Sequence, residues 1–360
     1  MLVCVSDELD FASDLYCGTA GYYDRFRLSY APALIGDLLR QTEPSGQGRL
    51  LDLACGTGQL TFALCDRFAS VWAVDQEPGM VEVVRAKAAA AGCGHIRPVV
   101  SAVEDLVTEP DSVELVVIGN AFHRLRRAMV ARLVFGWLQP AGFLALCWSS
   151  GTQAGSEEWQ LALGELLRRW QAALGAQGRV PANWQEPQRE LPDSEVLRGA
   201  GFATVGRYEF KVAHSWTVPE LAGWVRSLSV LPPSVLVDRG ADFDAELGTV
   251  LDPFTRDGRL TERVSYAYEL ARKPPRDVTT MAGGGMPPDI SPLSGHSSRV
   301  RLRRWLSAHL SGVLPGAIAP VTTPDDGHQA RLYLGGVFIC ARLHDHGSLM
   351  VVYGTNDPWS

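Results

Sequence analysis

The sequence lacks an uninterrupted apolar run long enough to cross a membrane as a helix. Such a helix needs about 20 predominantly apolar residues. The nearest candidate, 133–148, is interrupted by Gln139, Pro140 and Gly142. The first ten residues carry no basic cluster, which argues against a secretory signal peptide. We therefore expect a cytoplasmic protein with no membrane contact.

Clustered cysteines and an excess of basic charge are also missing. The seven cysteines are scattered along 360 residues without a C-x-x-C pair. This argues against a disulfide framework and a zinc site, so no metal is expected. Asp and Glu number 40 against 33 Lys and Arg, for a net charge of −7. Because nucleic-acid-binding domains are usually basic, no nucleic acid partner is expected.

Short apolar runs alternate with amphipathic stretches between residues 49 and 148. Pro78 begins one stretch and Gly92 follows its end, the usual placement of these residues around a helix. This alternation predicts an α/β fold with a doubly wound, mostly parallel sheet. The expected strands are 49–54, 71–74, 96–100, 113–118 and 143–148, and the helices between them are 59–68, 78–91 and 126–138.

The pattern changes after residue 148. A Gly- and Pro-rich stretch at 276–298 is typical of a flexible linker. His344-Asp-His346 is interpreted as a loop, because three clustered residues lack further metal-ligand spacing. Before the linker we expect helices at 156–174, 194–199, 219–227 and 243–251 and strands at 205–213 and 263–271. After it we expect a basic helix at 299–310 and strands at 330–342 and 348–353.

A glycine loop follows the first expected strand. Its sequence is Asp52-Leu-Ala-Cys-Gly-Thr-Gly58, and Asp75 ends the second strand. Gly56 and Gly58 tolerate positive φ and leave no Cβ against a ligand. The helix that follows offers free backbone N–H groups. Asp75, 19 residues after Gly56, is placed to accept hydrogen bonds from two ribose hydroxyls. The pattern predicts a nucleoside cofactor.

Two residues separate the candidate cofactors. A dinucleotide site usually has a third glycine where this chain has Thr61. Asp52 would repel a diphosphate, but it would attract a ligand that carries an ammonium and a sulfonium. Nicotinamide-dependent oxidoreduction is therefore the weaker hypothesis. The D-x-x-x-G-x-G pattern resembles the glycine loop of class I S-adenosylmethionine-dependent methyltransferases.

Four further segments resemble the bacterial small-molecule branch related to trans-aconitate methyltransferase. Leu28 and Ala31 replace expected prolines, and Arg124 replaces an expected tryptophan. These departures bear on the substrate more than on the fold or cofactor. The segments are 18–32, 120–123, 216–229 and 261–272, and together they cover about residues 15–275.

The resemblance implies a Rossmann-like sheet of seven mostly parallel strands with helical cap insertions. It assigns residues 1–275 to the methyltransferase domain, with cap segments at about 1–45, 151–193 and 214–260. Residues 276–298 remain a linker, and 299–360 form a small C-terminal α+β extension of open role. A homodimer is left open.

The same resemblance implies roles around the cofactor. Backbone groups of Ala54, Gly56 and Gly58 hold the methionine end. Asp52 orients the loop or helps to bind the ammonium, and Asp75 holds the ribose.

Further residues complete the implied cofactor site. Gln76 covers the adenine edge and Met80 stacks on the ring. Val103 and Glu104 flank the adenine. Asn120 is also expected to bind the cofactor.

The methionine end has two more candidates. Arg27 presents a fork of donors suited to the cofactor carboxylate. Tyr22 or Tyr23 closes over the sulfonium, whose charge favours an aromatic face. A surface position for Arg27 and ordinary packing for the tyrosines are the alternatives.

The acceptor side is marked by His123, just beyond the fourth strand and beside the strand-order reversal. An imidazole with an ordinary pKa near ~6.5 suits a general base, and acceptor positioning is the alternative. Six of the ten tryptophans lie between residues 148 and 224, where they line an acceptor pocket or pack a cap.

The expected function is methyl transfer from S-adenosylmethionine to an O or N atom of a small molecule in specialised metabolism. The alternative is a non-catalytic scaffold or regulator that binds the cofactor with the same fold.

Overall fold

The computed structural model describes residues 14–181, 183–275, 329–334, 337–343 and 349–354. The chain divides into two compact units, residues 1–276 and 277–360. No helix in the described ranges is long and apolar enough to cross a bilayer.

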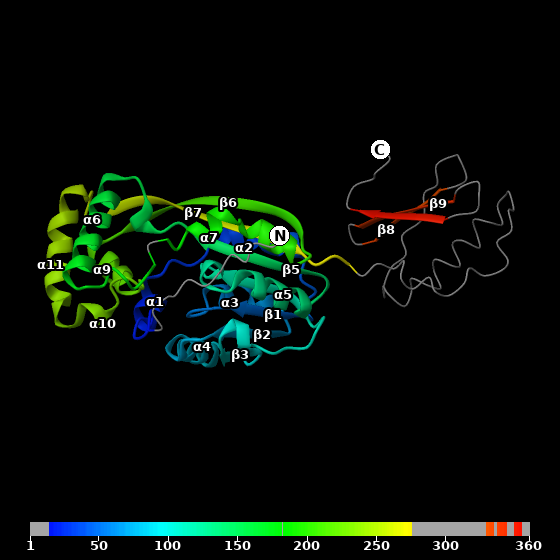
Figure 1. Cartoon of the computed structure of the whole chain (residues 1–360), viewed down its shortest axis with the longest axis horizontal. Helices are drawn as coiled ribbons and strands as arrows, with labels where there is room; N and C mark the ends of the chain where they lie inside the picture. The colour runs from blue at the N-terminus through cyan, green and yellow to red at the C-terminus, as the bar shows by residue number, and fades with distance from the viewer. Residues whose placement is uncertain (1–13, 182, 276–328, 335–336, 344–348, 355–360) are drawn as a thin grey trace, which may run out of the picture. The chain divides into compact units, whose positions relative to one another are not determined.

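A seven-stranded sheet forms the centre of the first unit, in the order β3-β2-β1-β4-β5-β7-β6 (Figure 1). β7 runs antiparallel to β5 and β6, and the other neighbours pair in parallel. This confirms the predicted Rossmann-like fold. The strands are β1 (Arg49–Leu53), β2 (Ser70–Asp75), β3 (Ile96–Val100), β4 (Val113–Gly119), β5 (Leu138–Ser149), β6 (Ala203–Trp216) and β7 (Leu260–Arg272).

Helices cover both faces of the sheet. Leu50 and Leu51 on β1 are both fully buried, but they belong to different core clusters because side chains alternate across a strand. This two-sided burial explains the continuous apolar strands. One face packs against α2 (Pro32–Thr42), α3 (Gln59–Leu64) and α4 (Pro78–Ala90), and the other against α5 (Arg127–Trp137) and α8 (Asp193–Gly199).

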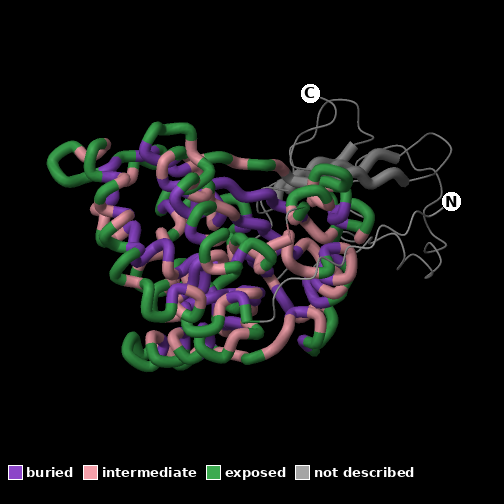
Figure 2. The backbone as a smooth tube through the Cα atoms, turned by 60° about the vertical axis from the view of Figure 1, so that its left-hand side comes forward, coloured by how far each residue is buried: buried purple, intermediate pink, exposed green. Residues whose placement is uncertain are grey.

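A helical cap occupies one end of this unit (Figure 1). Its apolar core joins the cap helices to the first residue of β7 and the last of β6. Figure 2 shows the buried positions of this unit gathered in its interior and the exposed ones on its outer turns. The cap helices are α6 (Glu158–Ala173), α9 (Val218–Arg226), α10 (Pro233–Leu236) and α11 (Gly240–Leu251), and the shorter α1 (Ala20–Phe26) contacts α9.

A buried carboxylate ties the cap to the sheet. Glu262 on β7 accepts hydrogen bonds from Gln160 of α6 at 2.8 Å and from the indole of Trp216 at 2.5 Å. Thr152 donates a third at 2.9 Å. A buried charge is tolerated only with such partners, so this network sets how α6 meets β6 and β7.

Several predicted boundaries were wrong. β6 and β7 extend beyond the predicted strands, because they continue as a pair past the end of β5 and reach the cap. All of α2 lies in the segment expected as cap, yet it packs on the sheet. The segment between α6 and α8, for which no helix was expected, also forms α7 (Glu186–Glu190).

The second unit contains a three-stranded antiparallel sheet in the order β10-β9-β8. The single strand predicted at 330–342 is two strands, β8 and β9, which pair antiparallel. The predicted linker, the basic helix at 299–310 and the His344–His346 loop lie outside the described residues. The strands are β8 (Gln329–Leu334), β9 (Val337–Leu343) and β10 (Leu349–Gly354).

Candidate active site

The glycine loop leaves β1 with three residues in the left-handed region. The φ angles are +52° at Ala54, +55° at Gly56 and +84° at Gly58. The backbone N–H of Cys55 donates to Val74 on β2 at 2.9 Å. The loop therefore turns sharply at the carboxyl ends of β1 and β2, and its backbone carries no Cβ at two of the three positions.

Asp75 braces this loop from the end of β2. One carboxylate oxygen accepts the N–H of Gly56 at 2.8 Å and the other accepts the N–H of Glu77 at 2.9 Å. Burial raises its pKa above the usual range. Asp75 is thus brought to the loop as the sequence predicted, and its carboxylate keeps acceptor capacity for a ligand hydroxyl.

Asp52 is buried beneath the loop, with 1% of its surface exposed. Its Oδ2 atom accepts both the backbone N–H of Thr61, at 2.8 Å, and the Thr61 hydroxyl, at 2.6 Å. The contacts favour loop orientation over ammonium binding. They also explain why a threonine, and not a third glycine, occupies position 61.

The α1 helix lies against the loop through Tyr23. A Cβ atom added to Gly56 would lie 3.3 Å from the Tyr23 ring. Tyr22 instead stacks on Phe26 with a 6.2 Å centroid separation and is 36% exposed. Of the two tyrosine candidates, Tyr23 is the one at the loop.

Arg27, just after α1, stacks on Tyr23 with its Cζ atom 4.8 Å from the ring centroid. One guanidinium nitrogen donates to the carbonyl of Ser227 at 3.2 Å. Its Nε atom is buried and makes no hydrogen bond with the described residues. A buried donor without a partner is costly, so Arg27 fits an anionic ligand.

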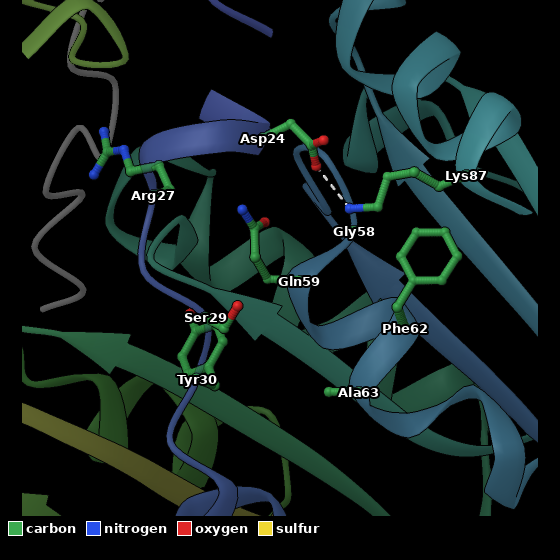
Figure 3. A pocket seen from close by; sticks show the side chains of 9 residues that line it. All are labelled: Asp24, Arg27, Ser29, Tyr30, Gly58, Gln59, Phe62, Ala63 and Lys87. Carbon is green, nitrogen blue, oxygen red and sulfur yellow. Dashed lines mark hydrogen bonds and ion pairs between the residues drawn. The ribbon is translucent and has the colours of Figure 1, made fainter. Parts of the chain in front are cut away.

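A recess of about 310 Å³ opens beside the loop, and we call it the glycine-loop recess (Figure 3). Lys87 of α4 lies at the edge of this recess. Its ammonium donates to Asp24 at 2.7 Å and to the carbonyl of Thr57 at 3.0 Å. These bonds tie α1 to the loop. The lining residues are Asp24, Arg27, Ser29, Tyr30, Gly58, Gln59, Phe62, Ala63 and Lys87.

Tyr30 was not singled out from the sequence. Its hydroxyl accepts a hydrogen bond from Asn120 at 3.2 Å, and a Cβ atom on Gly119 would lie 2.7 Å from that oxygen. Asn120, at φ +52°, also accepts the N–H of Ser149 at 2.9 Å. Tyr30 lies in the quoted 18–32 segment, but only the fold brings it to the end of β4.

Comparisons with known proteins agree with this geometry. Residues 50–142 match the family model of a methyltransferase domain. An uncharacterised methyltransferase of Mycobacterium tuberculosis is 34% identical over 149 residues, or 41% of this chain and 57% of the relative. Another, from Schizosaccharomyces pombe, is 24% identical over 245 residues, or 68% of this chain and 89% of that relative. The chain thus spans little more than half of the mycobacterial relative.

A solved structure shares the fold. It is a protein from Anaeromyxobacter dehalogenans named as a candidate type II methyltransferase, with a TM-score of 0.51 and 20% identity over 69% of this chain and 99% of that chain. Residues 50–142 thus match a methyltransferase domain, and they lie in a sheet with the strand order of class I methyltransferases. Such a domain uses S-adenosylmethionine and implies a methyl acceptor.

The residues predicted to surround the adenine lie beside Asp75. The residue after β3, Ser101, donates to the carbonyl of Asp75 at 3.0 Å, which places the following turn next to it. In that turn Val103 is buried, and Glu104 accepts the N–H of Arg126 at 3.0 Å. Met80 is buried and Gln76 is exposed. Glu104 therefore caps the start of α5 and is also predicted to flank the adenine.

His123 lies in a short turn after β4. Its Nε2 atom accepts a hydrogen bond from Arg124 at 3.2 Å, and its ring centroid is 4.9 Å from that of Trp184. Burial, with the neighbouring charges of Arg124 and Arg127, lowers the pKa of His123 to about 3. A ring with so low a pKa is a weak base, so the geometry favours the positioning alternative.

The tryptophans of the methyltransferase domain divide into two groups. Of the six tryptophans between residues 148 and 224, four are buried in the cap core, which favours cap packing over an acceptor pocket for these four. Trp148 packs under Arg207, whose Cζ atom is 4.5 Å from the ring centroid, and Trp184 contacts His123. The four in the cap core are Trp159, Trp170, Trp216 and Trp224.

Proposed function

We propose that this chain transfers a methyl group from S-adenosylmethionine to an O or N atom of a small molecule. The observation that carries the proposal is the glycine loop braced by Asp75 and covered by Tyr23. It lies where the strand order reverses between β1 and β4, the usual ligand position in such sheets. The resemblance to the trans-aconitate branch supports a small-molecule acceptor in specialised metabolism.

The residues at the loop fit the cofactor. The unpartnered Nε of Arg27 suits a carboxylate, and the face of Tyr23 suits a sulfonium. Positive φ at Gly56 and Gly58 leaves room for a ligand against the backbone. When bound, S-adenosylmethionine supplies an activated methyl group on a cationic sulfur.

Residues of the chain then hold the cofactor and exclude water. Asp75 holds the ribose, while Met80, Val103, Glu104 and Gln76 surround the adenine. Tyr23 and α1 exclude water from the loop.

Acceptor alignment falls to residues at the end of β4. Tyr30 and His123 position the reacting atom, because in-line displacement depends mainly on alignment. Asn120 keeps its predicted place at the cofactor and donates to the Tyr30 hydroxyl. A neutral His123 with a lowered pKa is a poor proton acceptor. We therefore assign His123 to acceptor positioning.

Calorimetric titration of the full chain with S-adenosylmethionine and S-adenosylhomocysteine tests cofactor binding. Radiolabelled methyl transfer from S-adenosylmethionine into a cell extract then tests catalysis. We expect both cofactor forms to bind, NAD not to bind, and label to enter a small-molecule fraction. Absence of binding by either adenosyl compound would overturn the proposal. Binding without any S-adenosylhomocysteine formation would favour the scaffold alternative.

We also propose a cellular location for the protein. We place the chain in the cytoplasm, in keeping with the free thiols of Cys17, Cys55, Cys65, Cys93 and Cys147. Its acidic charge disfavours nucleic acid as the acceptor. Cell fractionation with an antibody to the native chain tests this location.

A further inference from the structure

Arg27 also lines a second recess, of about 230 Å³, which we call the α9 recess. No residue of the glycine loop lines it, nor does Asp75. In Figure 3 the guanidinium of Arg27 turns away from Gln59 and Ser29 of the glycine-loop recess. The α9 recess combines the α1–α2 connection, the end of β6 and the start of α9. Its other lining residues are Arg25, Phe26, Leu28, His214, Trp216 and Glu220.

Two arginines give this recess a cationic side. Arg25 lies over the Phe26 ring, with its Cζ atom 5.2 Å from the centroid, and Arg27 contacts Tyr23 and the Ser227 carbonyl. Neither forms an ion pair with a carboxylate of the described residues. The buried Nε of Arg27 is assigned above to the cofactor carboxylate, so Arg27 adds only its charge to this recess. An anion would complete these contacts.

One acidic residue opposes them. Glu220 accepts the backbone N–H of Thr217 at 2.7 Å and its hydroxyl at 2.9 Å, which caps α9. These bonds lower the pKa of Glu220, so the carboxylate stays ionised. Two arginines against one glutamate still leave the recess cationic.

The opposite side of the recess is aromatic. Trp216 is 2% exposed and its indole N–H donates to Glu262, so it lines the recess with only a small part of its apolar ring. His214 meets Trp216 edge-on, with ring centroids 4.4 Å apart. Burial lowers the pKa of His214, which leaves a neutral ring with one donor and one acceptor. The volume has room for roughly eight water-sized groups at ~30 Å³ each.

We propose that the α9 recess binds the anionic end of the methyl acceptor, as a small aromatic anion held between Arg25 and His214. This rests on the proposed function. The acceptor's other end then extends toward the glycine loop past Arg27, the residue shared by both recesses.

Benzoate and its uncharged counterpart benzamide are the probes, titrated into the full chain saturated with S-adenosylhomocysteine. We expect benzoate to bind at least fivefold more tightly than benzamide. Arg25→Gln should weaken benzoate about fivefold, equivalent to about 1 kcal/mol, and leave benzamide unchanged. Glu220→Gln keeps the capping geometry but removes the opposing charge, so benzoate should bind two- to threefold more tightly. Arg85→Gln, on the exposed side of α4, is the matched control.

Equal affinity for the two probes, no benzoate binding, or equal effects of Arg25→Gln and Arg85→Gln would overturn the proposal. Competition between benzoate and S-adenosylhomocysteine would also overturn it. Separating the extract by ion exchange adds an independent test, since the methyl-accepting activity should lie in the anionic pool. Cofactor binding is measured in the same titrations, so failure of the proposed function is seen separately.

Discussion

The hydroxyl of Thr61 donates a 2.6 Å hydrogen bond to the buried carboxylate of Asp52. The backbone N–H of the same residue donates a second, at 2.8 Å, to the same oxygen. The pair joins the end of β1 to the first turn of α3, directly beneath the glycine loop. Loop geometry and protein stability are therefore linked through one carboxylate.

Asp52 should make stability depend on pH. Burial raises its pKa to about 7, against about 3.9 in an unfolded chain. The folded state thus binds the proton more tightly, so this contribution is present below about pH 4 and is lost as pH rises to about 7. Urea unfolding of wild type and Asp52→Asn at several pH values measures it. A stability difference that is constant from pH 4.5 to 7.5 would refute this linkage.

Replacing Gly58 should cost more than replacing another left-handed glycine. Gly58 and Gly92 have φ of +84° and +67°, so alanine at either costs about 1–2 kcal/mol in backbone strain. A Cβ at Gly58 would also lie 2.9 Å from Phe62, whereas one at Gly92 meets nothing within 4 Å.

We expect Gly58→Ala to destabilise the chain by about 1–3 kcal/mol more than Gly92→Ala, because overpacking adds to the strain. Gly58→Ala should also weaken S-adenosylhomocysteine binding, and Gly92→Ala should not. Denaturant unfolding and calorimetry measure both effects. Equal stability losses in the two variants would contradict the packing at Gly58.

Lys87 should matter for cofactor affinity more than for stability. It joins Asp24 of α1 to the Thr57 carbonyl of the loop. We expect Lys87→Met to weaken S-adenosylhomocysteine binding about threefold to tenfold. It should change unfolding free energy by less than about 1 kcal/mol, because the ion pair is partly exposed.

Arg85→Met is the control for this change, since Arg85 pairs only locally with Glu82 on the same helix. Adding Asp24→Asn to Lys87→Met should produce little further loss, because the two residues act as one contact. Fully additive losses would show that the pair does not hold α1 on the loop.

His123 should remain neutral through the physiological range. Burial, and then the charges of Arg124 and Arg127, lower its pKa to about 3. Because the folded pKa lies below the unfolded value near ~6.5, the stability contribution is lost as pH falls from about 6.5 toward 3. Ring-labelled NMR, assigned with His123→Gln, checks this. An inflection near pH 6.5 would restore the general-base assignment.

The fold was predictable from the sequence because its signals are local. Apolar runs, the Pro78 and Gly92 boundaries and the glycine loop each depend on neighbours along the chain. The lengths of β6 and β7 were not predictable, since their ends, Trp216 and Leu260, pack into the core of the cap, which distant segments of the chain form. The tryptophans were equally ambiguous, because aromatic lining and aromatic packing use the same residues.

The sequence by itself determined the α/β alternation, the glycine loop with Asp75, and the choice of S-adenosylmethionine over a dinucleotide. These follow from short-range spacing and from charge. The tertiary structure decided that Asp52 binds Thr61, that Tyr23 and not Tyr22 covers Gly56, and that His123 is buried beside Trp184. Each of these joins segments far apart in the chain or depends on burial, and burial is set only when the elements pack.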